Sequence, residues 1–229
     1  MTRLFWTALI FLMTLPDLTA ARKTIDDRLA EFGTAARARL GPDFAAAGVN
    51  YPPRQIVLIG LKEELLLELH ATGADGVLHF VRDYPVRAAS GSSGPKLRRG
   101  DNQVPEGIYR IEALNPNSRF HLSLRLDYPN AFDHARAKED HRSDLGGDIM
   151  IHGEAASKGC LAMGNPAAEE LFVLAADTGL PNIAVILAPR DLRRQSLGET
   201  APLPAWTAGL YRQLRQELAK YPRRPRPLP

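Results

Sequence analysis

The sequence predicts a mainly β, sandwich-like catalytic domain with flanking α-helices. Short apolar runs separated by turn residues recur between residues 55 and 127, as expected for strands. Runs with the helical spacing of apolar residues lie before residue 41 and after residue 165. A chain with strands in its middle and helices at its ends fits a sheet that forms the core and carries helices around it.

Length and composition fit one catalytic domain with additions. The chain has 229 residues, of which 45% are hydrophobic, so it can bury a full core without disulfides. A formal net charge of +3 suits an anionic cell envelope but is too small to indicate a nucleic-acid partner. The single cysteine excludes an internal disulfide and a multi-cysteine zinc site. The sequence therefore predicts no nucleic acid, no metal and no cofactor.

Residues 1–21 have the pattern of a secretory signal peptide. Arg3 precedes an apolar run over residues 4–15, Pro16 ends that run, and small residues follow at 19–21. The apolar run is short for crossing a bilayer, so a cleaved signal is favoured over a membrane anchor. We therefore expect export to the periplasm or cell envelope. A lone exported cysteine is either buried and inert or kept free for a purpose.

Residues 22–50 predict an N-terminal helical segment that packs against the domain or forms a stalk. Apolar residues recur at helical spacing between residues 25 and 40. Thr24 and Asp27 resemble a capping box, with Asp in place of Glu or Gln. Pro42, directly after a glycine, is expected to end the helix.

Residues 55–82 predict a β-meander of three short strands. The clearest strand follows at 119–127, where apolar and polar residues alternate strictly from Phe120 onward. Its polar face carries His121 and Arg125. These two side chains could contact a substrate if that face lines a cleft, and the alternative is a solvated sheet face.

Residues 88–101 predict a loop with three basic side chains, Lys96, Arg98 and Arg99. The simplest interpretation is a solvated basic loop. Contact with an anionic polymer is the alternative.

The residues with the chemistry of a catalytic site lie between positions 148 and 165. His152 precedes Cys160 by eight positions, and a short apolar run predicts a strand that ends at His152. A helix is expected next, with Asn165 as its N-cap and Pro166 as its first residue. Strand, glycine-containing loop, cysteine and helix thus follow one another.

This order suits a cysteine nucleophile. A free thiol is mostly protonated at neutral pH, and the imidazole of His152 can accept the proton and hold an ion pair. The dipole of a helix that starts shortly after Cys160 favours negative charge there. Backbone N–H groups around Gly159 and Cys160 could hold an oxyanion. The alternative is a buried structural cysteine near a histidine that merely ends a strand.

The C-terminal region, residues 190–229, predicts a helix and a basic, proline-rich tail. The last predicted strand, over residues 182–188, is buried and directly precedes this region. The helix is expected to begin at Pro204 and to present Leu210, Leu214 and Leu218 on one face. Residues 221–229 hold too many prolines for a helix and are expected to be disordered.

The segment from His152 to Cys160 resembles the active-site signature of the L,D-transpeptidase catalytic domain family of the YkuD type. The resemblance rests on His152-Gly153 and on the run from Ser157 to Cys160, and it covers about residues 51–189. The short gap and the Gly-Cys-x-Ala-Met run are most similar to the YafK-like branch. Lys158 stands where many members have histidine, and Ala162 stands where many have arginine.

The resemblance implies roles for single residues. Cys160 would be the nucleophile and His152 the base, while Gly153, Ser157 and Gly159 would support the imidazole, the loop and the oxyanion. Because Ala162 cannot hold a carboxylate, that contact must come from elsewhere, and Lys158 is favoured over Arg125 and the loop around Arg98. His121 and Asn130, which lies in a Tyr-Pro-Asn-x-x-Asp segment, complete the substrate candidates.

The implied activity is that of an exported peptidoglycan L,D-transpeptidase, in which the cysteine forms a thioester at the diaminopimelate L-centre of a stem peptide. An amine, for example on an envelope protein, would then resolve the thioester. The alternative is a hydrolase with the same site, an amidase or a carboxypeptidase, because water can take the place of the amine. A non-catalytic cell-wall binding module is a further alternative. A papain-like protease is disfavoured because its cysteine precedes its histidine.

Overall fold

The computed structural model describes residues 22–194 and 203–221. The predicted signal peptide and the tail beyond residue 221 lie outside the described residues. The strands are β1 (Ile56–Leu61), β2 (Leu66–Thr72), β3 (Leu78–Pro85), β4 (Ala88–Ala89), β5 (Gly107–Ser118), β6 (His121–Leu126), β7 (Met150–His152), β8 (Leu161–Ala162) and β9 (Ile183–Ala188). The helices are α1 (Ile25–Ala46), α2 (Ala131–Glu139), α3 (Asn165–Thr178), α4 (Thr207–Leu218) and a 3-10 turn, η1 (Leu180–Asn182).

The nine strands form one mixed sheet in the order β3-β2-β1-β9-β5-β6-β7-β8-β4. The pairs β1–β9 and β7–β8 are parallel, and all other pairs are antiparallel. Strand β5 connects two half-sheets, since its first residues pair with β9 and its later residues pair with β6. Two register shifts in the β5–β6 ladder bend the sheet.

Both half-sheets contribute to one main core, and this makes the domain sandwich-like. Leu58 and Leu69 come from the first half, while Leu124 and Ile151 come from the second half, and all four belong to the same buried cluster. The mainly β, sandwich-like fold with flanking helices is therefore confirmed.

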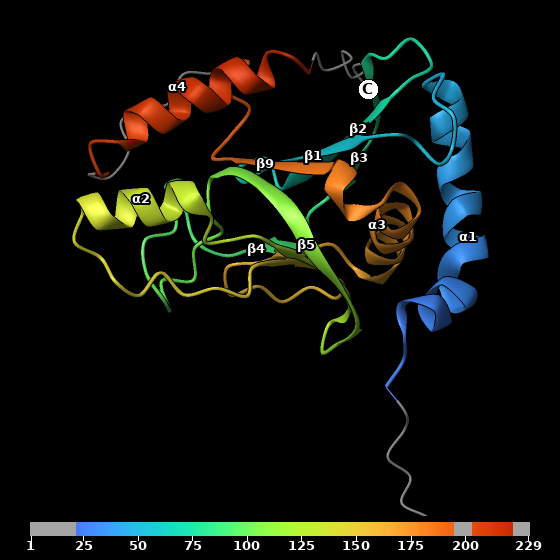
Figure 1. Ribbon diagram of the computed structural model, residues 1–229, viewed down its shortest axis with the longest axis horizontal. Helices are drawn as coiled ribbons and strands as arrows, with labels where there is room; N and C mark the ends of the chain where they lie inside the picture. The colour runs from blue at the N-terminus through green and yellow to red at the C-terminus, as the bar shows by residue number, and fades with distance from the viewer. Residues whose placement is uncertain (1–21, 195–202, 222–229) are drawn as a thin grey trace, which may run out of the picture.

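Helices cover both faces of the β1–β9 region (Figure 1). Strand β1 is buried along its whole length, with Leu58 facing the main core and Val57 facing a second cluster under α4. Full burial on both faces is why β1 and β9 are continuous apolar runs in the sequence. In the described residues no helix is long and apolar enough to cross a membrane.

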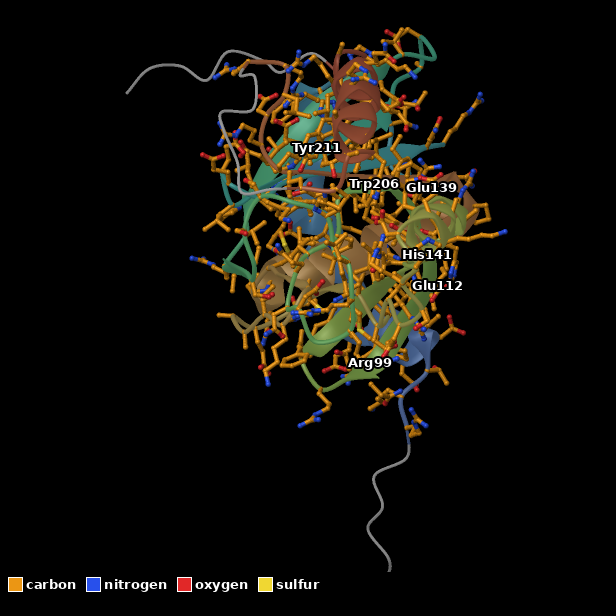
Figure 2. All side chains as sticks on the ribbon, turned by 90° about the vertical axis from the view of Figure 1, so that its left-hand side faces the viewer. Arg99, Glu112, Glu139, His141, Trp206 and Tyr211 are labelled. Carbon is orange, nitrogen blue, oxygen red and sulfur yellow. The ribbon has the colours of Figure 1, made fainter. Side chains whose placement is uncertain are left out.

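Helix α4 buries the predicted leucine face, but it begins at Thr207 rather than at Pro204. The preceding residues form a turn in which the Pro204 carbonyl accepts from the Thr207 N–H. The Tyr211 hydroxyl donates to Glu106 at 2.8 Å, and the Trp206 indole N–H donates to Asp140 at 2.8 Å (Figure 2). These bonds join the C-terminal helix to the sheet and to α2.

Helix α1 starts as predicted, with Thr24 and Asp27 forming a reciprocal capping box. The prediction that Pro42 ends the helix is wrong, because α1 continues to Ala46. Phe44, two residues further, is 1% exposed, and its burial with Leu40 outweighs the one backbone hydrogen bond that proline removes. The helix packs against α3, where Arg37 makes a two-pronged ion pair with Asp177.

Candidate active site

His152 is the last residue of β7 and lies in the interior of the second half-sheet. It pairs with Ser123 of β6 on one side and with Ala162 of β8 on the other. Its side chain is buried, with the residue only 1% exposed. The Nδ1 atom lies 2.6 Å from the Gly153 carbonyl oxygen, which can only accept, so Nδ1 carries the proton. This tautomer leaves Nε2 free to act as a base.

Gly153 is required by close backbone contacts. A Cβ at this position would lie 2.7 Å from Asn165 Oδ1 and 2.8 Å from the Phe120 carbonyl oxygen. The Gly153 N–H donates to that Phe120 carbonyl at 3.1 Å. Glycine therefore allows the chain after His152 to press against the turn between β5 and β6.

Asn165 does not cap α3 as predicted. Gly164 occupies the cap position and Asn165 is the first helical residue. The Asn165 side chain instead accepts from the Glu154 N–H at 2.8 Å. The amide oxygen is thus used to hold the turn after His152, eleven residues earlier in the chain.

Cys160 lies directly before β8 and on the same face of the sheet as His152. The parallel register pairs His152 with Ala162, so Cys160, two residues earlier, has its side chain on the same side as Ala162. The register also places Cys160 beside Met150. The thiol and the imidazole are thus diagonal neighbours on adjacent strands. The Sγ atom lies 3.7 Å from the Asp148 carbonyl oxygen.

The same face also carries Arg125. Strand β6 pairs Arg125 with Met150 on one side of β7, and Cys160 directly precedes β8 on the other side of β7. The guanidinium is half-exposed and contacts Glu112 at 2.7 Å and Asp148 at 3.4 Å.

Two serines hold the loop that carries Cys160. The Ser157 hydroxyl donates to the Cys160 carbonyl at 2.7 Å and accepts from the Ser90 N–H at 3.0 Å. The Ser90 hydroxyl donates to the Asn102 carbonyl at 2.8 Å and accepts from the Gly159 N–H at 2.6 Å. Each hydroxyl has one proton and both are used, so the two Oγ atoms, 3.0 Å apart, are in contact only.

The Gly159 N–H is therefore not available to an oxyanion, contrary to our prediction. Ser90 accepts this hydrogen, and the left-handed backbone at Gly159, with φ of 102°, turns the chain against Gln103. Ser90 accepts from Gly159 and not from the next backbone donor, the Cys160 N–H. The role of Gly159 is to allow the turn, which a side chain would obstruct 3.0 Å from the Gln103 carbonyl oxygen.

Burial disfavours the charged forms of both the thiol and the imidazole. The pKa of the Cys160 thiol is raised, mainly because the thiol is buried. A backbone hydrogen bond from Met150 and the charge of Lys96 offset only part of this increase. Burial lowers the pKa of His152, and the bond to Gly153 only partly offsets this. His152 is not among the groups that shift the pKa of Cys160. Helix α3 begins after β8, five residues beyond Cys160, and the helix-dipole effect is confined to the first turn.

The site thus differs from the predicted resting ion pair, and we expect this difference in the pH dependence of alkylation. Because the thiolate is the reactive form, the rate of Cys160 alkylation by a small neutral reagent should keep rising above the ordinary thiol pKa of about 8.5. Mass spectrometry of the protein alkylated over a pH series measures this. If the alkylation rate is already maximal at pH 7, the resting site holds the thiolate–imidazolium ion pair that the sequence predicts.

The remaining predicted residues lie at different places. Lys158 is exposed in the loop before Cys160. His121 is held by the helices instead, because its Nε2 lies 3.0 Å from Glu169 of α3 and its ring packs on Phe32 of α1.

Asn130 has a structural task. Its side-chain oxygen accepts from the Phe132 and Asp133 N–H groups and caps α2, and its Nδ2 donates to the Ile108 carbonyl. Both ends of this side chain are used, which removes it from the substrate candidates. The other histidines near α2, His134 and His141, are exposed, and His141 lies in the turn after the helix (Figure 2).

The prediction of a solvated basic loop is wrong for Lys96. This residue is 7% exposed, and its ammonium donates to Asp101 and to the Arg98 carbonyl. Arg99, in contrast, is exposed and pairs with Asp144 (Figure 2). The loop is folded around Asp101, which also accepts from the backbone N–H groups of residues 97, 98 and 103.

Ser90 and Phe120 are two residues of the site that the sequence patterns did not indicate. Ser90 is one of several serines in a loop, and no local pattern marks the one that reaches Gly159, 69 residues later. Phe120 was assigned to the apolar face of a strand, but it lies in the turn before β6 and stacks on His152. Phe120 is the first residue of the alternating pattern, and the pattern gives no sign that the strand begins only at His121.

Enzymes that use a cysteine nucleophile place a histidine beside it, and a mixed sheet presents the two here on adjacent strands. The chain belongs to the L,D-transpeptidase catalytic domain family, YkuD, whose model matches residues 57–183. The resemblance found in the sequence is thereby confirmed.

Relatives agree with this assignment. The chain is 34% identical over 133 residues to "Putative L,D-transpeptidase YafK" of Escherichia coli strain K12, covering 56% of this chain and 51% of that protein. It therefore spans about half the length of the relatives that it matches. The solved structure of the helical cell shape determining protein Pgp2 from Campylobacter jejuni superposes with a TM-score of 0.50 at 19% identity, over 77% of this chain and 58% of that chain. This likeness shows the fold alone.

Proposed function

We propose that this protein is an exported L,D-transpeptidase that acts on peptidoglycan stem peptides with Cys160 as nucleophile and His152 as base. The observation that carries the proposal is the β7–β8 register, which places Cys160, directly before β8, diagonally across from a buried His152 whose free nitrogen is Nε2. Membership of the L,D-transpeptidase family supports peptidoglycan as the substrate. An envelope location follows from that substrate.

The first half-reaction forms a thioester. Nε2 of His152 takes the thiol proton as the sulfur attacks the carbonyl of the diaminopimelate L-centre. The new C–S bond forms, the C–N bond to the terminal D-amino acid breaks, and His152 returns the proton to the leaving amine. Because burial disfavours both charged forms, proton transfer accompanies attack and no ion pair has to form beforehand. The Cys160 N–H is the candidate donor to the oxyanion.

The second half-reaction decides between the two candidate activities. An amine, on another stem peptide or on an envelope protein, would give a new amide and make the protein a transferase. Water would give a carboxylic acid and make it a hydrolase. The catalytic pair is the same in both, so the proposal for transfer rests on the family. A non-catalytic binding module is less consistent with a complete nucleophile–base pair.

Mass spectrometry of muropeptides incubated with the purified protein tests this function. Tetrapeptide stems should lose their terminal D-amino acid and gain the mass of an added amine acceptor. An acyl-enzyme should appear on the intact protein and should be absent when the stems lack the diaminopimelate centre. If tetrapeptide stems remain unchanged and the protein acquires no adduct, the proposal is wrong.

Arg125 and Lys158 are the two candidates for the contact with the substrate carboxylate. Sequence analysis favoured Lys158 as the carboxylate contact, but Arg125 shares the face of Cys160. We expect Arg125→Ala to raise KM for stem peptides by roughly tenfold, the scale of one charged hydrogen bond. Lys158→Ala should change KM less. Steady-state kinetics of both variants distinguishes the two candidates. A larger increase in KM for Lys158→Ala than for Arg125→Ala would assign the carboxylate contact to Lys158.

A further inference from the structure

The turn between β5 and β6 reaches over the catalytic histidine. Residues 119 and 120 form the turn, and its backbone is held to the site because the Phe120 carbonyl accepts from the Gly153 N–H at 3.1 Å. The next residue, His121, has a left-handed backbone with φ of 71°. Its side chain anchors the turn to Glu169 of α3 and to Phe32 of α1. The turn is thus fixed from both sides.

This turn places an aromatic ring on the imidazole. The rings of Phe120 and His152 are stacked, with centroids 4.5 Å apart and an angle of 26° between their planes. His152 is 1% exposed, whereas Phe120 is 37% exposed. One side of the phenyl ring therefore faces solvent while the other covers a face of the catalytic base.

We propose that Phe120 determines the fate of the acyl-enzyme by excluding water from His152, so that an amine resolves the thioester in preference to water. This inference rests on the proposed function. In the preferred step the amine nitrogen attacks the thioester carbon, a C–N bond forms, the C–S bond breaks, and the proton of the amine passes through His152 to the thiolate. In the competing step a water oxygen attacks and its proton takes the same route. Both steps need the base, but the amine comes with an apolar chain that can lie against the phenyl ring.

The ratio of transfer to hydrolysis tests the inference. Acyl-enzyme from a tetrapeptide stem is resolved in the presence of a fixed concentration of amine acceptor, and both products are counted by mass spectrometry. Phe120→Ala should lower the ratio by about three- to tenfold, the range that corresponds to the worth of one aromatic contact. The ratio compares two products of one intermediate, so it does not depend on how much of the variant is folded.

Three further variants complete the design. Phe120→Tyr keeps the ring and should retain the parent ratio, and Phe120→Leu keeps apolar bulk without a flat ring and should give an intermediate ratio. Val77→Ala removes apolar surface at a residue that is 56% exposed just before β3, and it should leave the ratio unchanged.

The possible failures can be told apart. If the parent forms no thioester, the proposed function is wrong and this inference falls with it. If the parent forms the thioester and the Phe120→Ala ratio equals that of the parent, the inference alone is overturned. A rise in KM for the stem peptide at an unchanged ratio would also overturn it, because Phe120 would then be a substrate contact. A parent that only hydrolyses its thioester at saturating amine excludes the inference as well.

Discussion

Replacement of Cys160 by alanine is expected to lower the turnover of stem peptides by about a thousandfold or more, because no other described group can form the acyl-enzyme. Cys160→Ser should be similarly inactive, since a hydroxyl is a far weaker nucleophile than a thiol beside a neutral imidazole. Product formation and the mass of the intact protein after incubation with substrate measure both effects. The variants should show no adduct.

The fold should survive this change. Cys160 is partly buried, and its replacement by alanine removes a single sulfur atom, so the free energy of unfolding should change by about 1 kcal/mol or less. Thermal unfolding of the variant provides the control. An alanine variant that melts like the parent and still turns over stem peptides would overturn the mechanism.

Replacement of His152 by alanine is expected to lower kcat by on the order of a hundredfold or more, as is typical for loss of a general base. The pH dependence should report the same group. Burial lowers the pKa of His152, so the free base persists below the ordinary histidine value of about 6.5. The acid limb of kcat/KM in the parent should therefore lie below that pH, and the variant should lack this limb.

His134→Ala is the matched control for this experiment. His134 lies on α2 and is exposed, and like His152 it precedes Cys160 in the chain. Its removal should leave kcat and the acid limb unchanged. If His134→Ala loses activity while His152→Ala keeps a rate near that of the parent, His152 is not the general base.

Local patterns were enough for several parts of the fold. The capping box at Thr24, the strand that ends at His152 and the leucine face of α4 are each indicated by a residue pattern within a short stretch of sequence. The end of α1 was predicted wrongly because proline predicts a stop only where no distant packing opposes it. Phe44 reaches the core two residues beyond Pro42, and its burial decides the outcome.

In the candidate site, too, some features follow from local sequence and others from distant packing. The sequence alone determined which residues are paired, since His152, Cys160 and the glycines beside them lie within nine positions. The parallel register of β7 and β8 then places thiol and imidazole on one face. A spacing of eight residues is compatible with that register but does not specify it.

What surrounds the pair was decided by the tertiary structure. The Ser90 hydroxyl takes the N–H of Gly159 from 69 residues away, and the stacked ring of Phe120 comes from a hairpin 32 residues before His152. These contacts set which hydrogen-bond donors stay free and how far each group is buried. Burial in turn shifts both pKa values, and it thereby disfavours the ion pair that local chemistry predicts. The sequence thus determined the reacting atoms, whereas packing between distant segments decided their protonation and their access to water.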